Sequence, residues 1–129
     1  MKFYVASSFQ NIEQVRYFSR ELTKRGFFHT YDWTENIRAS TLAELKRIGE
    51  EEKRAVKEAD VVVILLPAGK GSHIEMGMAL ALNKKVYLYS PNEEVKNPAE
   101  TSTFYFLPEV ERCSGSLEDL IITISSYKY

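Results

Sequence analysis

The sequence predicts an α/β protein in which a parallel sheet of about five strands lies between two layers of helices. Two observations indicate this class. Short apolar runs alternate with longer amphipathic segments along the chain, which is typical of repeated strand–helix–strand units. The run 61–66 (VVVILL) has no polar residue, as expected for a strand that is covered on both faces. We therefore expect a three-layer α/β/α sandwich with a flavodoxin-like strand order and right-handed crossovers.

Two strands and two helices are predicted in the first half of the chain. The apolar residues of the first helix recur every three or four positions and so form one face of it. The second helix alternates acidic and basic residues, as expected for a face exposed to solvent. In chain order, these elements are a strand over 2–6, a helix from Asn11 to Gly26, a strand over 27–30 and a helix from Ser40 or Thr41 to about Glu58.

The second half of the chain continues the alternation of strands and helices. Asp60 opens the third strand, and the last strand has the character of an edge strand. Residues 93–108 are the least regular part, with a short helix over 103–107. The remaining elements are a helix over 72–82, a strand over 86–89, the edge strand over 109–113 and a last helix that follows Ser114, Gly115 and Ser116.

Composition indicates one compact domain that spans residues 1–129. With 129 residues, 44% of them hydrophobic, the chain can bury a core of its own. The formal net charge of -1 gives no electrostatic reason to expect a nucleic acid as a partner. Every apolar run is far shorter than the roughly 20 residues that a membrane helix requires, so we expect no membrane partner.

Cysteine usage and the first residues predict a cytoplasmic protein. Cys113 is the only cysteine, so it cannot form a disulfide within the chain, and a reducing compartment is expected. The first residues enter a strand pattern directly and do not resemble a signal peptide.

The segment 61–77 is the most informative about function. It predicts a buried strand, a turn with Gly69 and Gly71, and the first turn of a helix that carries Glu75. Parallel sheets place ligands beyond the carboxyl ends of their strands, and glycines there let backbone amides approach a ligand. Because a helix N-terminus favours negative charge, we expect an ionised Glu75 within reach of a substrate.

Glu75 also has a purely structural interpretation. Ser72 and Glu75 have the S-x-x-E spacing of a capping box, in which the glutamate only bonds back to the Ser72 amide. Two familiar functional motifs do not fit the turn. The P-loop spacing G-x-x-x-x-G-K-[ST] is absent, and the H-x-E of zinc-dependent deaminases has no P-C-x-x-C partner in a chain with one cysteine. We predict no metal site and no cofactor.

The glycine turn resembles that of the nucleoside 2-deoxyribosyltransferase superfamily, which includes 2'-deoxynucleoside 5'-phosphate N-hydrolases. The family pattern G-x-G followed by x-E-L-G-x-A-L is similar to GKGSHIEMGMAL at 69–80. The resemblance implies that Glu75 attacks the anomeric carbon of a sugar and forms a covalent intermediate, and that Tyr4 orients this glutamate. It also implies that Glu52, eight positions before Asp60, takes the place of a family aspartate.

The sequence departs from the family pattern at the turn. Six positions before the nucleophile, transferases of the family carry an aspartate and the phosphate-binding hydrolases a serine, whereas this chain has Gly69. Ser72 is the hydroxyl that this turn offers instead. Glu52 and Asp32 are candidates for delivering a proton to the leaving base.

Further residues at the predicted ligand edge are candidates for binding the substrate. Hydroxyls and amides at strand ends can hold a sugar or phosphate, and an aromatic ring can stack on a base. Each residue could equally be an ordinary turn or packing residue. The resemblance adds the region after the fourth strand, which in that family reaches the pocket of a neighbouring subunit. The candidates are Ser7, Ser8, Phe9, Asp32, Trp33, Gly69, Gly71, Ser72, Ser90, Asn92 and Ser102.

Three functional hypotheses follow from these residues. The first is an enzyme, either a hydrolase or a transferase, that cleaves or exchanges the N-glycosidic bond of a nucleoside or nucleotide through a covalent glycosyl-glutamate. It would form a homodimer or higher homo-oligomer with shared pockets. The second is a non-catalytic nucleotide-binding module that uses the same turn. The third is an activity like that of NAD glycohydrolases.

Overall fold

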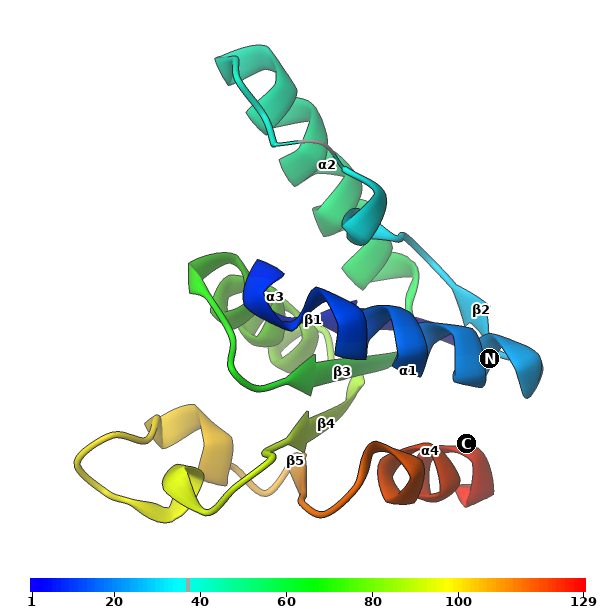
Figure 1. Cartoon of the computed structure of the whole chain (residues 1–129), viewed down its shortest axis with the longest axis vertical. Coiled ribbons are helices and arrows are strands. Elements are labelled where there is room, and N and C mark those ends of the chain that lie inside the picture. The colour runs from blue at the N-terminus through cyan, green and yellow to red at the C-terminus, as the bar shows by residue number, and fades with distance from the viewer. Residues whose placement is uncertain (37) are drawn as a thin grey trace.

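The computed structural model describes residues 1–36 and 38–129. Within them, a five-stranded parallel sheet has the order β2-β1-β3-β4-β5 (Figure 1). This is the flavodoxin-like order, so the predicted fold class is confirmed. The strands are β1 (Lys2–Ala6), β2 (Phe28–His29), β3 (Val61–Leu65), β4 (Lys85–Tyr89) and β5 (Val110–Cys113).

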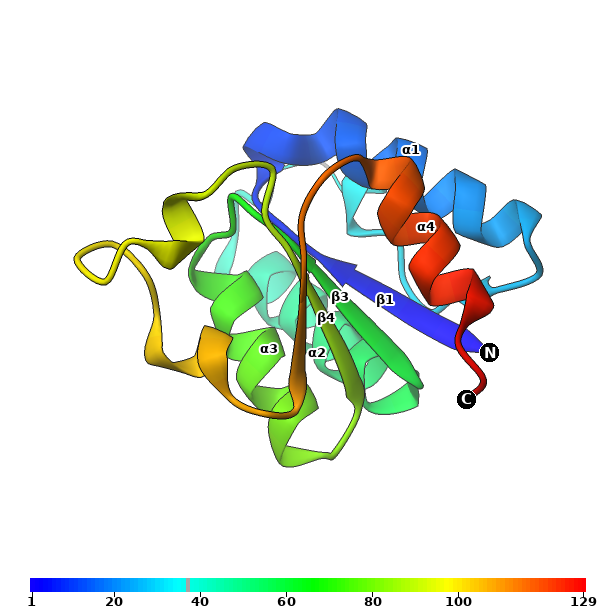
Figure 2. The ribbon, with the colours of Figure 1, turned by 90° about the horizontal axis from the view of Figure 1, so that it is seen from below.

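Helices cover both faces of the sheet, as Figure 2 shows. On one face lie α1 (Ile12–Lys24) and α4 (Leu117–Ser126), and on the other lie α2 (Leu42–Glu58) and α3 (Lys70–Ala81). β3 is buried along its whole length between the two layers, which explains its unbroken apolar sequence. The amino-terminal half of α2 projects beyond the rest of the molecule (Figure 1).

Local capping signals set several of the element boundaries, which agree with the sequence prediction. The Thr41 hydroxyl caps α2 by accepting from the Glu44 N–H at 3.1 Å. The Ser116 hydroxyl caps α4 by accepting from the Asp119 N–H at 3.0 Å. β2 is shorter than predicted, because only Phe28–His29 pairs with β1 as a strand.

The start of α3 corrects one prediction. α3 begins at Lys70 with Gly69 as its N-cap, earlier than the predicted residue 72. Ser72 therefore lies inside the first turn, where its Oγ accepts from the Gly69 N–H at 3.4 Å. The capping box with Ser72 as the N-cap and Glu75 as its partner is wrong. The Glu75 carboxylate is left available for another contact.

Short 3-10 helices lie in the connections that follow the strands. They are η1 (Phe9–Asn11), η2 (Trp33–Glu35), η3 (Glu94–Lys96) and η4 (Thr103–Phe106). η4 confirms the short helix predicted in the irregular segment. Among the residues that the structure describes, no helix is long and apolar enough to span a membrane. In the same residues, no group of His, Cys, Asp and Glu side chains could hold a metal ion.

Candidate active site

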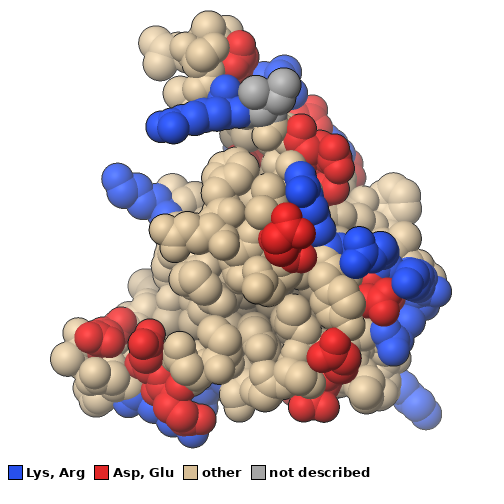
Figure 3. Space-filling model, in the orientation of Figure 1, with Lys and Arg blue, Asp and Glu red and all other residues tan. Residues whose placement is uncertain are grey.

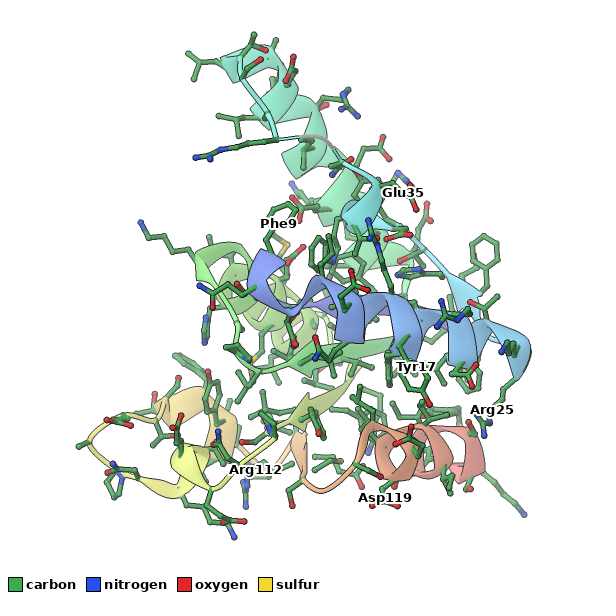
Figure 4. The ribbon with its side chains drawn as sticks, viewed as in Figure 1. Phe9, Tyr17, Arg25, Glu35, Arg112 and Asp119 are labelled. Carbon is green, nitrogen blue, oxygen red and sulfur yellow. The ribbon has the colours of Figure 1, made fainter. Side chains whose placement is uncertain are left out.

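A cavity of about 730 Å³ lies beyond the carboxyl ends of β1 and β3, where the sequence predicted a ligand site. Its wall combines the chain after β1, the loop around η2, one face of α2 and the start of α3. Figure 4 shows Phe9 at the amino-terminal end of α1, on the side from which α2 projects. The lining residues are Ser7, Ser8, Phe9, Gln10, Trp33, Asn36, Arg38, Ala39, Leu45, Ile48, Glu52, Gly69, Gly71, Ser72 and Glu75.

Glu75 and Tyr4 are joined at the inner end of this cavity. Glu75 comes from the second turn of α3 and is 6% exposed. Tyr4 comes from the centre of β1, is fully buried, and its hydroxyl donates a hydrogen bond to Glu75 Oε2. The same hydroxyl lies 3.4 Å from Glu52 Oε2, on α2. The Tyr4 phenol therefore joins Glu75 to Glu52, and these are the three residues that were predicted to be catalytic.

Burial sets the protonation state of Glu75. Loss of hydration is the main reason why the pKa of its carboxyl is raised to about 8, and the Glu52 charge acts in the same direction, while the hydrogen bond from Tyr4 opposes both. The pKa of Tyr4 is also raised, chiefly by burial and then by Glu75, so Tyr4 stays protonated and acts as a donor. The expectation of an ionised Glu75 at a helix N-terminus is therefore wrong for the unliganded protein at neutral pH. Glu75 lies beyond the first turn, and burial outweighs the helix dipole.

The serine hydroxyls of the site hold the chain after β1 against the end of β3 and the start of α3. Ser7 Oγ donates to the Leu65 carbonyl at 2.7 Å, and Ser72 Oγ donates to the Ser7 carbonyl at 2.9 Å. Ser8 Oγ accepts from the Gln10 N–H at 3.2 Å. These serines therefore have a structural role, and all three line the cavity.

Two aromatic rings form one wall of the cavity. Trp33 is 6% exposed and its Nε1 donates to the Val5 carbonyl at 2.7 Å, which fixes the indole under the loop. Phe9 stands edge-to-face on Trp33, with ring centroids 5.2 Å apart, and is 62% exposed. Phe9 therefore offers more ring surface to a base than Trp33 does.

Four predicted binding residues lie outside this cavity. Asp32 lines a separate cavity, and its Oδ1 accepts from the Thr34 N–H at 3.0 Å. Ser90 and Asn92 line cavities beside β4 and β5, and Ser102 caps η4. These four side chains do not gather around Glu75 within one chain, and their roles in binding stay predictions.

Several lining residues were missed by the sequence analysis. Gln10 of η1, together with Asn36 and Arg38 after η2, brings two amides and a cation to the cavity wall. Leu45 and Ile48 line it from α2, and here a signal existed, because they precede Glu52 by helical spacings on the same face of α2. The loop residues had no comparable signal, since only the path of the folded chain brings them to the site.

A parallel sheet with a buried glutamate on the helix after its central strand defines an α/β protein with a small-molecule site at the switch point of the sheet. The chain belongs to the nucleoside 2-deoxyribosyltransferase family, whose model matches residues 3–111. That match runs from β1 into the first half of β5 and so includes Tyr4, Glu52 and Glu75. No curated protein matches the chain in sequence.

Solved structures share the fold at low sequence identity. The 2-deoxyribosyltransferase of Bacillus psychrosaccharolyticus has a TM-score of 0.69 and 18% identity, with 100% of this chain and 93% of that chain covered. A conserved protein from Enterococcus faecalis has a TM-score of 0.67 and 20% identity, with 94% of each chain covered. The CMP N-glycosidase of Clostridium botulinum has a TM-score of 0.62 and 16% identity, with 96% of this chain and 98% of that chain covered. At these identities the similarity shows the fold.

Proposed function

We propose that this protein is an enzyme that cleaves or exchanges the N-glycosidic bond of a nucleoside or nucleotide, with Glu75 as the nucleophile. The proposal is carried by one buried carboxyl, held by the Tyr4 hydroxyl at the wall of a cavity with the volume of a small-molecule site. Membership of the family and similarity to a glycosidase and a transferase support it.

The first chemical step requires an ionised Glu75. A carboxylate oxygen of Glu75 forms a bond to the anomeric carbon, while the C–N bond breaks and its electron pair leaves with the base. The hydrogen bond from Tyr4 holds the carboxylate in one orientation during this attack. The leaving base requires a proton, which has to come from a second group.

Glu52 is the group best placed to supply this proton. It lines the cavity, and the Tyr4 hydroxyl lies between it and Glu75. In one transfer, protonated Glu75 gives its proton to the Tyr4 oxygen while Tyr4 gives its own proton to Glu52, so the nucleophile is ionised, the acid is created and Tyr4 again donates to Glu75. In the second step, water or another base attacks the sugar–Glu75 ester, and Glu52 takes back a proton from the attacking group. The two carboxyl groups of Glu75 and Glu52 therefore need one proton between them for the reaction to proceed.

The decisive experiment detects both the product and the intermediate. The protein is incubated separately with deoxynucleosides, their monophosphates, cytidine monophosphate and NAD, and free base is followed by chromatography. Intact-protein mass spectrometry after acid quenching should find a pentosyl adduct in the wild type and none in Glu75→Gln. Glu50→Gln, an exposed change on α2, is the matched control and should keep both signals.

Other outcomes would assign the site differently. Tight binding of a nucleotide without any release of base would favour the nucleotide-binding module. This alternative is also supported by position 69, which is a glycine and not an acidic residue. Release of nicotinamide from NAD alone would favour the NAD-glycohydrolase hypothesis. Release of base from any substrate by Glu75→Gln at the wild-type rate would remove Glu75 as the nucleophile.

Arg38 favours a substrate that carries a phosphate. It brings a positive charge to the cavity wall, and the wall also presents the hydroxyls of Ser7, Ser8 and Ser72. We expect Arg38→Gln to raise KM for a nucleoside monophosphate about tenfold, the value of one charged hydrogen bond. KM for the matching nucleoside should not change. Arg47→Gln, elsewhere on exposed α2, is the control.

The proposed function also includes a homodimer. Exposed apolar side chains follow α2 and α3 from the projecting end of α2, and one of them, Leu45, also lines the cavity. A homodimer through this surface would cover these side chains and narrow the open side of the site. The cytoplasmic location expected from the sequence stays a prediction.

A further inference from the structure

The side chain of His73 joins the glycine turn of the candidate site to the segment after β4. Its Nδ1 lies 2.8 Å from the Gly69 carbonyl oxygen, and its Nε2 lies 2.7 Å from the Tyr105 hydroxyl of η4. The imidazole and phenol rings stack with centroids 5.9 Å apart and planes 19° apart. One imidazole therefore bridges the N-cap of α3 and a segment that does not itself line the Glu75 cavity.

The chemistry of the partners sets the direction of both hydrogen bonds. A backbone carbonyl can only accept, so in the neutral ring the proton of His73 is on Nδ1. Nε2 is then an acceptor, and the Tyr105 hydroxyl donates to it. Tyr105 is 8% exposed, and burial raises the pKa of its phenol, which keeps the hydroxyl protonated and able to donate. The hydrogen bonds therefore run in one direction, from Tyr105 through His73 to Gly69.

The Gly69 carbonyl accepts two hydrogen bonds from His73. Besides Nδ1, the His73 backbone N–H donates to it at 3.2 Å. On the other side of the residue, the Gly69 N–H donates to Ser72 Oγ at 3.4 Å, and Ser72 Oγ donates to the Ser7 carbonyl at 2.9 Å. The turn is thus tied to the chain after β1 on one side and to η4 on the other. Because a peptide unit is planar, fixing the Gly69 carbonyl also fixes the direction of the Lys70 N–H.

Neutral side chains carry the contact between η4 and α3. Among the residues that the structure describes, no ion pair joins these two elements. Figure 3 shows Asp and Glu side chains gathered over the outer part of the segment after β4, at the lower left, and uncharged side chains between this segment and α3. Tyr105 is the buried residue of η4, while its neighbours Phe104 and Phe106 are exposed. The hydrogen bond between Tyr105 and His73 is therefore the specific polar link between η4 and the turn.

We infer that His73 is a positioning residue of the candidate active site and that Tyr105 acts through it. The inference rests on the proposed function, because α3 carries the proposed nucleophile, Glu75, two residues after His73. His73 does not line the cavity, but Gly69, which it holds, does. A small displacement of the turn changes the distance between Glu75 and the anomeric carbon, and misplacement of a reacting group lowers kcat.

Nitrogen NMR tests these contacts without a substrate. At a pH where the ring is neutral, the His73 imidazole of the wild type should carry its proton on Nδ1, and His73→Asn identifies its signals by their loss. In Tyr105→Phe, Nε2 loses its donor. We therefore expect part of the proton population to move to Nε2 and the amide signals of Gly69 and Gly71 to shift.

Tyr89→Phe is the matched control for Tyr105→Phe. Tyr89 is also 8% exposed, and its hydroxyl also donates a hydrogen bond of 2.7 Å, but to the Gly115 carbonyl. Tyr89 does not line the Glu75 cavity. Its variant should leave the tautomer of His73, the glycine signals and kcat unchanged.

Kinetics separate positioning from a general loss of structure. We expect Tyr105→Phe and His73→Ala each to lower kcat about tenfold, the effect of one lost hydrogen bond, with little change in KM. His73→Asn should recover part of the kcat lost in His73→Ala, because the asparagine amide can donate to the Gly69 carbonyl from about the place of Nδ1. A merely structural role would lower the amount of folded protein and give no such rescue.

The two measurements keep the inference apart from the proposed function. If the wild type releases no base, the proposed function fails, while the NMR signals still show whether Tyr105 and His73 hold the turn. A proton on Nε2 in the wild type, or unchanged glycine signals in Tyr105→Phe, would overturn the inference. Wild-type kcat in both Tyr105→Phe and His73→Ala would overturn it as well.

Discussion

The Tyr4 hydroxyl donates a hydrogen bond to the Glu75 carboxyl, which joins the middle of β1 to the second turn of α3. Tyr4 lies beside Val62 of the central strand, and its ring is fully buried. The candidate nucleophile is therefore oriented from the buried interior of the sheet and not from a loop. Pre-organisation of this kind lowers the entropic cost of attack on the substrate.

Tyr4→Phe should separate the orientation of Glu75 from the packing of the core. The ring keeps its place, but Glu75 loses a hydrogen bond that lowers its pKa. We expect kcat to fall about tenfold or more with little change in KM, since one positioned hydrogen bond to a charged group is lost. The pH profile should also move to higher pH, because the pKa of Glu75 rises further.

The pH profile distinguishes the orienting role of Tyr4 from a merely structural role. A variant that only loosened the fold would lower activity at every pH without moving the profile. Tyr87→Phe is a suitable comparison, because it removes another tyrosine hydroxyl from the sheet, on β4, at a residue that does not line the Glu75 cavity. An unchanged kcat in Tyr4→Phe would contradict the orienting role.

The shared proton predicts how the rate depends on pH. With its pKa at about 8, Glu75 keeps one proton at neutral pH, and this is the proton that the proposed transfer delivers to Glu52. Above pH 8 this proton is lost, and no acid remains for the leaving base. We therefore expect kcat/KM to fall by tenfold per pH unit above about 8. A rise of kcat/KM through this pH would instead show that ionisation of Glu75 alone limits the reaction.

The same carboxyl makes stability depend on pH. Its pKa is about 8 in the folded protein and near the ordinary 4.5 when unfolded, so between these values the folded chain binds the extra proton. The contribution of Glu75 to stability is complete below pH 4.5 and is lost as the pH rises through 8. The free energy of unfolding should fall by a few kcal/mol over this window, at about 1.4 kcal/mol for each pH unit between the two pKa values. Denaturant unfolding of Glu75→Gln, which cannot ionise, should lack this loss and exceed the wild type above pH 8.

The sequence predicts the frame of the site well because its signals are local. The apolar run of β3 and the glycines after it are enough to place Glu75 at the ligand edge. Tyr4 and Glu52 came from the family resemblance, and the parallel pairing of β1 with β3 explains why Tyr4 meets the distant Glu75. Thr41 and Ser116 mark helix starts because a capping hydroxyl acts within one turn.

The errors arise where tertiary contacts override such signals. α3 begins at Lys70 with Gly69 as its N-cap, and because glycine has no capping side chain, the sequence indicates Ser72 as the cap. Glu75 was expected to be charged because helix position can be read from a sequence, whereas burial cannot. Asp32 turns to cap η2 and so leaves the site, while Arg38 enters it from a loop. Residues of this kind are placed by the path of the chain and not by a periodic pattern.

The exposed surface of α2 and α3 makes a last prediction, about assembly. Leu42 is 84% exposed at the projecting end of α2, and Ile74 is 62% exposed on α3. Burial of Leu42 and Ile74 against a second copy would stabilise the dimer by about 1.5–3 kcal/mol for each of these side chains in each subunit. We expect analytical ultracentrifugation to show a dimer whose Kd rises at least ~100-fold in Leu42→Lys. Phe28→Lys changes another exposed apolar residue, on the edge strand β2, and should leave the dimer intact. A wild-type monomer with full activity would contradict both the proposed interface and the sharing of pockets. Leu42 and Ile74 do not line the cavity of their own chain, so they would affect the site only through the interface.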